Sequence, residues 1–334
     1  ILVKVPYTFF ERNSKYIFLV TLILLFIVLF IWPSWNWARW WINLPFLPFA
    51  IQPTEFLKFS LIIYLAYFFK RYKQNLHTFK EWFIPFFWIL FAVLLLVWLQ
   101  PDFWTIMVVI PVSVIMFFMA WANIKYLFML WVLWIFLSLW VYYWWEYDKE
   151  TWKNLNKLWY ITQRIDNFLN DEREAIKNKT INYQTEQALI AIWSWWFMWL
   201  WFWQSIQKFW YLPEVQWDFI FSVIVEELWF IWAFTLLSIY LYIWYRWYYI
   251  YRRIKDSFAK FVVVWISSWI LLQAFINIWV NLNMVPLTWI TLPFISYWGS
   301  SLLSLSLWLA LMLNISRDIE EKQKYSRKRN LLSF

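Results

Sequence analysis

The sequence predicts an all-α polytopic membrane protein with about eight transmembrane helices and one large extracytoplasmic loop. Of its 334 residues, 64% are apolar and 27% aromatic, and several long stretches carry no charge. Lys and Arg fall mainly in every second loop, that is, on one side of the membrane. The positive-inside rule requires this pattern of a multi-pass protein. The resulting net charge of +9 suits contact with anionic lipid headgroups rather than nucleic acid. The sequence contains no Cys, which excludes disulfides, thiolate metal sites and a Cys nucleophile.

Hydropathy places the eight spans along one integral-membrane domain that covers residues 1–334. The spans are expected at residues 16–32, 54–69, 82–99, 104–122, 126–145, 218–245, 260–280 and 289–314. With this topology the cytoplasmic segments are rich in Lys and Arg, whereas the short outer loops contain only Arg39. Both termini of the chain are therefore expected in the cytoplasm.

Two segments lie outside the spans in this interpretation. Residues 146–217 form the large extracytoplasmic loop, which begins with charges of alternating sign and becomes apolar and aromatic. Because long loops are often functional and this one leads directly into Asp218, we expect a lid or substrate-binding loop. Residues 317–334 are expected to form a disordered basic cytoplasmic tail.

The balance of Gly and Trp is abnormal for any membrane protein. The chain has 1 Gly and 35 Trp, where average usage gives about 7% Gly and membrane helices usually hold more. The surplus of Trp is close to the deficit of Gly, so we infer that Trp stands at positions that call for glycine. An unusually aromatic natural composition is the alternative.

Three carboxylates at the start of the span over 218–245 are the most informative charges in the sequence. Asp218 ends a polar, Pro-containing run, and Glu226 and Glu227 follow about two turns into the apolar stretch. Acidic groups inside a membrane are costly, so such a cluster indicates a functional site. The alternative for Asp218 is a simple helix cap, because Asp is favoured at helix N-termini.

Four polar clusters recur near the outer ends of the predicted spans. They are Arg39 with 52–58, which includes Glu55 and Lys58; Gln100 to Asp102; Lys208 and Glu214 with Asp218; and 293–301, which includes Ser296 and Ser300. Each has a simpler explanation, such as an intrahelical ion pair, a helix cap or a packing hydrogen bond. Their shared leaflet argues for one site, and cations beside carboxylates suit a phosphate-bearing lipid headgroup.

Several motifs resemble those of the SEDS family, whose members include FtsW and RodA. They are WARWWI at 37–42, QPTEFLK at 52–58, QPDFWT at 100–105, YLPEVQWDFIFSVIVEELWF at 211–230 and LTWITLPFISYWGSSLL at 287–303. The motifs stand in the family's order and cover nearly the whole chain. Trp occupies several of the family's Gly positions, among them Trp229 and Trp298. The family usually has ten spans, so we expect its first two to have no counterpart in this chain. The motifs resemble those of FtsW more than those of RodA.

The resemblance implies a peptidoglycan glycosyltransferase that polymerises lipid II at the outer face of the bacterial cytoplasmic membrane. Asp218 matches the family's essential aspartate. The polar residues that match its central cavity are Arg39, Glu55, Lys58, Asp102 and Gln187. The resemblance also implies a class B penicillin-binding protein as partner, and a divalent cation is possible as a cofactor. Two other functions remain open, a lipid II flippase and a non-enzymatic division scaffold.

Overall fold

The computed structural model describes residues 2–31, 42, 51–72, 79–100, 102–119, 132, 168, 181–194, 205, 208, 212, 216–288 and 290–331. In this part of the chain the regular structure is helical, apart from one isolated antiparallel bridge between Ile42 and Ile51. The expected all-α class is therefore confirmed.

The helices of the described residues follow one another in this order. They are a short 3-10 turn η1 (Leu2–Lys4), α1 (Tyr7–Ile31), α2 (Pro53–Arg71), a π-helical turn η2 (Phe79–Phe83), α3 (Ile84–Leu99), α4 (Phe103–Met119), α8 (Ile181–Ser194), α10 (Ile220–Tyr251), α11 (Ser257–Asn281) and α12 (Gly299–Leu331). Among the described residues, four stretches are long and apolar enough to cross a membrane: Tyr7–Phe30, Lys80–Leu99, Ser257–Asn281 and Gly299–Tyr325. The span expected at 126–145 lies outside the described residues except for Val132, so the number of spans remains a prediction.

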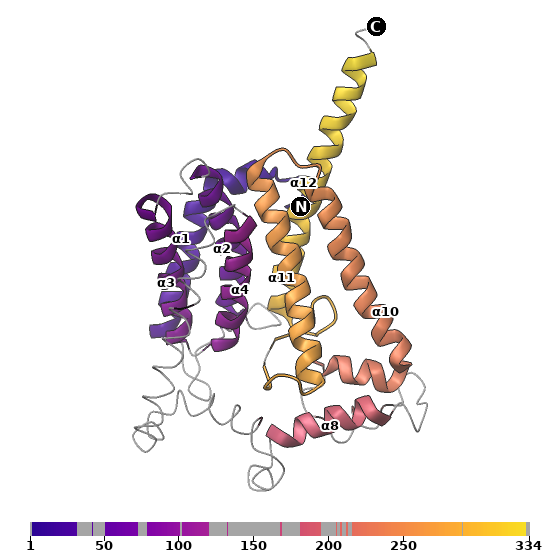
Figure 1. The fold of residues 1–334 in the computed structure, drawn as a ribbon. Coiled ribbons are helices and arrows are strands. Elements are labelled where there is room, and N and C mark those ends of the chain that lie inside the picture. Colours follow the sequence, from indigo (N-terminus) through magenta and orange to yellow (C-terminus); the bar gives the residue numbers. More distant parts are fainter. Residues whose placement is uncertain are drawn as a thin grey trace.

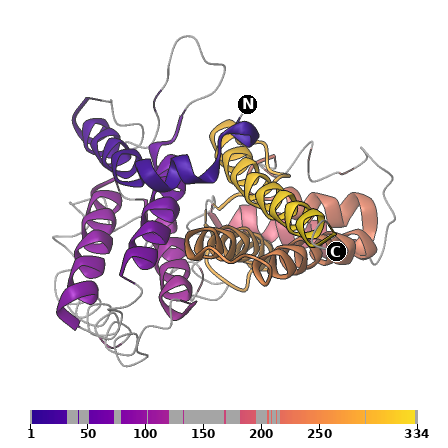
Figure 2. The same cartoon turned by 90° about the horizontal axis from the view of Figure 1, so that it is seen from above.

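Helix α11 is the centre of the bundle. Figure 1 shows α1 to α4 on one side and α10 on the other, with α11 between them. The view from above agrees, and it places α12 beside α11 (Figure 2). In the apolar stretch of α11, 72% of the residues are buried, against 28% in α1. Helix α8 lies across the end of the bundle where α10 begins, and it packs against α10.

Both ends of α11 are fixed by capping interactions. At its start the Asp256 side chain accepts a hydrogen bond from the backbone N–H of Ala259 at 3.1 Å. At its end Asn283 has a φ of 54°, and the N–H groups of Asn283 and Met284 donate to the carbonyls of Val280 and Trp279. This is the Schellman arrangement, in which Asn tolerates the left-handed conformation. The last turn of α11 is therefore held firmly in place.

Helix α10 contains a kink at Trp229. This residue has a φ of 74° and a ψ of 163°, whereas the chain on either side is helical. An L-residue with a Cβ is strained in this region of backbone space, which is essentially reserved for glycine. Since Trp229 is also one of the positions where the motifs call for glycine, the backbone supports the inference that Trp replaces Gly.

Buried indoles give a second sign of the same replacement. Trp265 in α11 and Trp308 in α12 are at most 1% exposed. Neither indole N–H has a hydrogen-bond partner among the described residues. Burying a polar group without a partner costs free energy, so these two positions also suit a residue without a polar side chain.

Two expectations for the C-terminal part of the chain are wrong. The last span does not begin at residue 289, because α12 starts only at Gly299 and residues 290–298 form turns and irregular structure in which Phe294 has a φ of 68°. The tail is not disordered over 317–331, because α12 continues to Leu331. Ion pairs one turn apart stabilise this extension, at 2.8 Å between Arg317 and Glu321 and at 2.6 Å between Lys322 and Asp318.

We expect the Trp229→Gly substitution to stabilise the protein. Glycine adopts the observed backbone angles without strain, so the free energy of unfolding should rise by about 1–3 kcal/mol. The measurement is thermal or denaturant unfolding of the purified protein in detergent.

Trp232→Gly is the matched control. Trp232 lies on the same helix and is 55% exposed, but its backbone is helical. Glycine there should lower the free energy of unfolding by roughly 0.5–1 kcal/mol. Destabilisation of similar size by both substitutions would contradict strain at residue 229.

Candidate functional site

The polar clusters that are separate in the sequence meet in the structure. The Gln52 amide lies 3.4 Å from the Asp102 carboxylate, which joins the first cluster to the second. The backbone N–H of Tyr297 donates to the carbonyl of Gln216 at 2.9 Å, which joins the fourth cluster to the turn that carries Asp218. These contacts bring the clusters together in pairs, and a shared functional site remains a prediction.

Glu55 and Lys58 form a buried ion pair on α2. Pro53 occupies the first turn of α2, where its missing N–H costs nothing, and the three-residue spacing then puts both side chains on one face. Lys58 Nζ lies 2.5 Å from Glu55 Oε1, and both residues are 7% exposed. A buried pair of this kind is stable only when further hydrogen bonds satisfy it.

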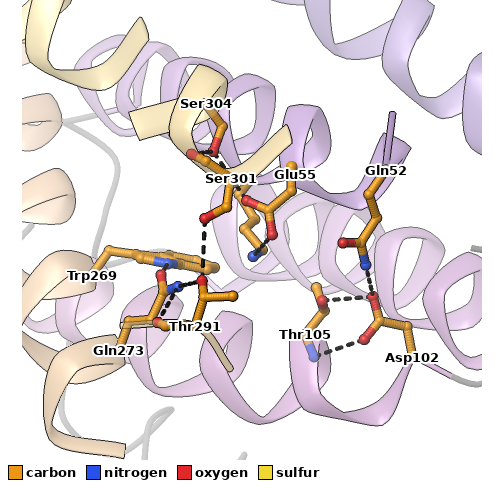
Figure 3. A network of polar contacts seen from close by, with 10 residues as sticks. Gln52, Glu55, Asp102, Thr105, Trp269, Gln273, Thr291, Ser301 and Ser304 are labelled. Carbon is orange, nitrogen blue, oxygen red and sulfur yellow. Dashed lines mark hydrogen bonds and ion pairs between the residues drawn. The ribbon is translucent and has the colours of Figure 1, made fainter. Parts of the chain in front are cut away.

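Helices α11 and α12 supply those further contacts. Ser304 of α12 donates to the second oxygen of Glu55 at 3.0 Å. Lys58 Nζ lies 5.6 Å from the ring centre of Trp269 of α11, within the range of a cation–π interaction. Figure 3 shows these groups facing one another across the interface of the three helices.

A chain of hydrogen bonds extends this network along α11. The Trp269 indole donates to Gln273, and the Gln273 amide donates to the carbonyl and to the hydroxyl of Thr291, at distances of 3.0 to 3.1 Å. The Thr291 hydroxyl lies 3.2 Å from that of Ser301 (Figure 3). The irregular segment before α12 is thereby tied to the Glu55–Lys58 pair.

Asp102 lies in the turn between α3 and α4. Its carboxylate accepts hydrogen bonds from the backbone N–H of Thr105 at 3.2 Å and from the Thr105 hydroxyl at 2.7 Å. The helix-cap alternative is therefore correct for this residue, although Gln52 also connects it to the first cluster. Burial is the largest influence on the Asp102 carboxyl and raises its pKa above the ordinary value.

Asp218 is buried at the start of α10 and is only 3% exposed. Its backbone carbonyl accepts two hydrogen bonds, both at 3.0 Å, from the side-chain amides of Asn277 and Asn281 on α11. Trp217 packs against Trp298 with ring centres 5.1 Å apart, so the Asp218 turn lies against the segment before α12. The turn is held from two sides.

Residues that come from the large loop lie against Glu226 and Glu227. Ser205 donates to Glu226 at 2.6 Å, and its hydroxyl also accepts the backbone N–H of Lys208 at 2.9 Å. Lys208 Nζ lies 3.8 Å from Glu227. Lys208 is thus placed beside a carboxylate of α10, and its expected role in substrate binding remains a prediction.

The remaining predicted residues are distributed as follows. Ser296 is buried, and its hydroxyl accepts the backbone N–H of Leu292 at 2.8 Å. Ser300 is buried in the first turn of α12, and Gln187 is half-buried on α8. Arg39 and Glu214 lie outside the described residues. Substrate binding by these five residues remains a prediction.

A divalent cation has no obvious ligand set in the part of the chain that the structure describes. No group of three or more Asp, Glu or His side chains is placed there to hold a metal ion. The cation therefore remains a sequence-based expectation, and no step below depends on it.

Five residues of this network were not singled out from the sequence. They are Gln273, Asn277, Asn281, Thr105 and Ser304. Buried amides and hydroxyls in apolar spans usually serve helix packing, so their residue types alone do not indicate a functional role. One signal was available, because Trp269, Gln273, Asn277 and Asn281 recur every four residues and so share one face of α11.

The fold and this site define a multi-pass membrane protein with a buried polar network between its helices. The family described as cell cycle protein, FtsW/RodA/SpoVE, matches residues 1–321 of the chain. The chain therefore belongs to the FtsW/RodA/SpoVE family.

Individual proteins agree with this assignment. The chain is 32% identical to stage V sporulation protein E of Bacillus subtilis over 281 residues, which are 83% of this chain and 71% of that protein. It is 31% identical to a probable peptidoglycan glycosyltransferase FtsW of Buchnera aphidicola, over 83% of this chain and 74% of the relative.

Two solved structures share the fold. A chain from a study of polymerization and crosslinking by a peptidoglycan synthase complex matches with a TM-score of 0.69 and 24% identity, over 95% of this chain and 84% of that one. The rod shape determining protein RodA of Thermus thermophilus matches with a TM-score of 0.64 and 21% identity, over 95% of this chain and 82% of RodA.

We expect the Lys58→Met substitution to destabilise the protein strongly. It leaves the Glu55 carboxylate buried without its cation, which typically costs about 3–5 kcal/mol. Denaturant unfolding in detergent measures the change.

Two further variants test whether the pair is the cause. The double variant Glu55→Gln with Lys58→Met removes both charges and should recover most of the lost stability. Lys322→Met breaks an exposed pair of similar length, 2.6 Å, and should cost at most about 1 kcal/mol. A double variant no more stable than Lys58→Met would argue against the charge explanation.

Proposed function

We propose that this chain is a peptidoglycan glycosyltransferase that polymerises lipid II into glycan strands. Membership of the FtsW/RodA/SpoVE family over residues 1–321 is the observation that carries the proposal. Relatives about 30% identical are named probable peptidoglycan glycosyltransferases, and the fold matches a chain of a peptidoglycan synthase complex. The buried polar network provides a place for such chemistry.

Asp218 is the proposed general base. Its carboxylate takes the proton from the acceptor sugar hydroxyl, whose oxygen attacks the anomeric carbon of the donor. The bond between that carbon and the diphosphate breaks, and the polyprenyl diphosphate leaves with the electron pair. A single displacement from an α-linked donor gives a β-linked product, so the reaction inverts configuration. A positioned base of this kind contributes about 10²–10⁴-fold to the rate.

The diphosphate group is the proposed partner of the cations. Arg39 and Lys58 are the candidates from the first cluster. Lys58 is already paired with Glu55 at 2.5 Å, which fixes the position of the ammonium group within a pair that is neutral overall. A cation held in place before the substrate arrives stabilises developing charge without a reorganisation cost.

The topology and the partner complete the proposal. The base and the cations face the outer leaflet of the bacterial cytoplasmic membrane, and both termini of this chain are cytoplasmic. A class B penicillin-binding protein is the proposed partner that cross-links the strands. The match to a chain from a peptidoglycan synthase complex supports such an assembly.

We expect the Asp218→Asn substitution to abolish polymerisation. The amide keeps the size of the side chain but is not a base, so the rate should fall by about 10²-fold or more. The assay is gel analysis of glycan strands formed from lipid II by the protein in liposomes. Asp318→Asn removes a half-buried carboxylate far along α12, where it pairs with Lys322, and should leave the rate unchanged. Full polymerisation by Asp218→Asn would refute the role of Asp218 as base.

A flippase is the second candidate function, because intramembrane charges also suit a transporter. Asp218→Ala separates the two activities. A variant that moves fluorescent lipid II between leaflets at the wild-type rate but forms no strands supports the glycosyltransferase. Loss of both activities together would favour transport as the primary role.

A further inference from the structure

We infer that Asn277 and Asn281 of α11 are positioning residues that hold the Asp218 turn in place for reaction. The inference rests on the proposed function of Asp218 as general base and extends it to the groups that act through that residue. Both asparagines are at most 1% exposed, and both donate to the backbone carbonyl of Asp218. Their effect on catalysis would therefore pass through the backbone.

Asn281 links the two ends of the turn that leads into α10. Its Nδ2 donates to the Asp218 carbonyl at 3.0 Å. Its Oδ1 accepts the backbone N–H of Ser222 at 3.2 Å and the Ser222 hydroxyl at 2.6 Å. Because an N–H group can only donate and a carbonyl can only accept, these partners fix the orientation of the amide.

This arrangement replaces the usual helix cap. Phe219 occupies the N-cap position of α10 and has no side chain that can cap the helix. The first turn of a helix leaves N–H groups that need acceptors, and here the acceptor for Ser222 comes from another helix. The direction in which α10 leaves the Asp218 turn is thus set by α11.

Asn277 ties the same carbonyl to a third segment. Its Nδ2 donates to Asp218 at 3.0 Å and to the carbonyl of Ile290 at 2.8 Å, so both of its N–H groups are used. Ile290 precedes Thr291, whose hydroxyl lies 3.2 Å from that of Ser301. The Ser304 hydroxyl lies 3.0 Å from both the Ser301 carbonyl and the Glu55 carboxylate. Glu55 is in turn the partner of Lys58. The proposed base and the proposed diphosphate-binding cation are therefore placed relative to each other by one hydrogen-bonded network.

The support beneath the two asparagines is rigid. Asn281 is the last residue of α11, immediately before the Schellman motif that fixes the end of the helix. The Asn281 amide also donates to the Asn277 carbonyl at 2.9 Å. Reacting groups must be held closely, and a displacement of about 1 Å can cost 10²-fold in rate.

The experiment compares Asn277→Leu and Asn281→Leu with the matched control Asn314→Leu. Asn314 lies in the middle of α12 and is also a largely buried asparagine that serves the start of another helix. It accepts the N–H of Tyr7 in the first turn of α1 at 2.8 Å and donates to the Val3 carbonyl at 2.9 Å. It lies away from the Asp218 turn. The kcat and the KM for lipid II are measured in liposomes, per mole of folded protein, with Asp218→Asn alongside.

We expect kcat to fall by about 10- to 100-fold in the Asn277 and Asn281 variants with little change in KM. Asn314→Leu should lose stability but keep the wild-type kcat. If Asn281→Leu yields no folded protein, Ser222→Ala removes only the hydroxyl that orients the Asn281 amide, and it should still lower kcat without raising KM.

Three results would overturn the inference. If Asp218→Asn is inactive while the Asn277 and Asn281 variants keep the kcat of Asn314→Leu, positioning is refuted and the proposed base remains. If KM rises and kcat is unchanged, the asparagines act on substrate binding. If Asp218→Asn keeps the wild-type rate, the proposed base itself fails, and the positioning role fails with it.

Discussion

The two hydrogen bonds from α11 to the Asp218 carbonyl are the contact on which the rest of the site depends. Together with the bond from Asn277 to the Ile290 carbonyl, they join helix α10, helix α11 and the irregular segment before α12. In a low-dielectric interior such bonds are strong, and an unpaired carbonyl or amide in their place would be expensive. The same contact therefore favours a single packing of these segments and a single placement of the acid at the head of α10.

Much of the architecture could be predicted from local sequence. Length and apolarity suffice for α2, α3, α4 and α11, because a helix that crosses a membrane must satisfy its own backbone and bury no charge without a partner. Because burying charge is costly, Glu55, Lys58 and Asp218 could be predicted from the sequence as candidate site residues. Their convergence followed from a topology that placed the polar clusters at one end of the bundle.

The parts that could not be predicted depend on tertiary contacts. The residues near Trp229 do not predict a kink in α10, except through the motif that has glycine at this position. The partners of Glu226 and Glu227 come from Ser205 and Lys208, in a loop whose position hydropathy does not determine. From the sequence, Asn277 and Asn281 would be interpreted as helix-packing residues. Only the structure shows that both contact the Asp218 carbonyl.

Helix α12 has the geometry of a lever. Its 33 residues amount to about 50 Å at 1.5 Å per residue, and it extends well beyond the bundle (Figure 1). Ser301 and Ser304 lie at one end against the Glu55 network, Asn314 pins the middle to the N-terminal segment, and the ion-paired end points away. A small tilt about Asn314 would move the two ends of α12 in opposite directions, so a shift of Ser301 and Ser304 against Glu55 would also displace the outer end.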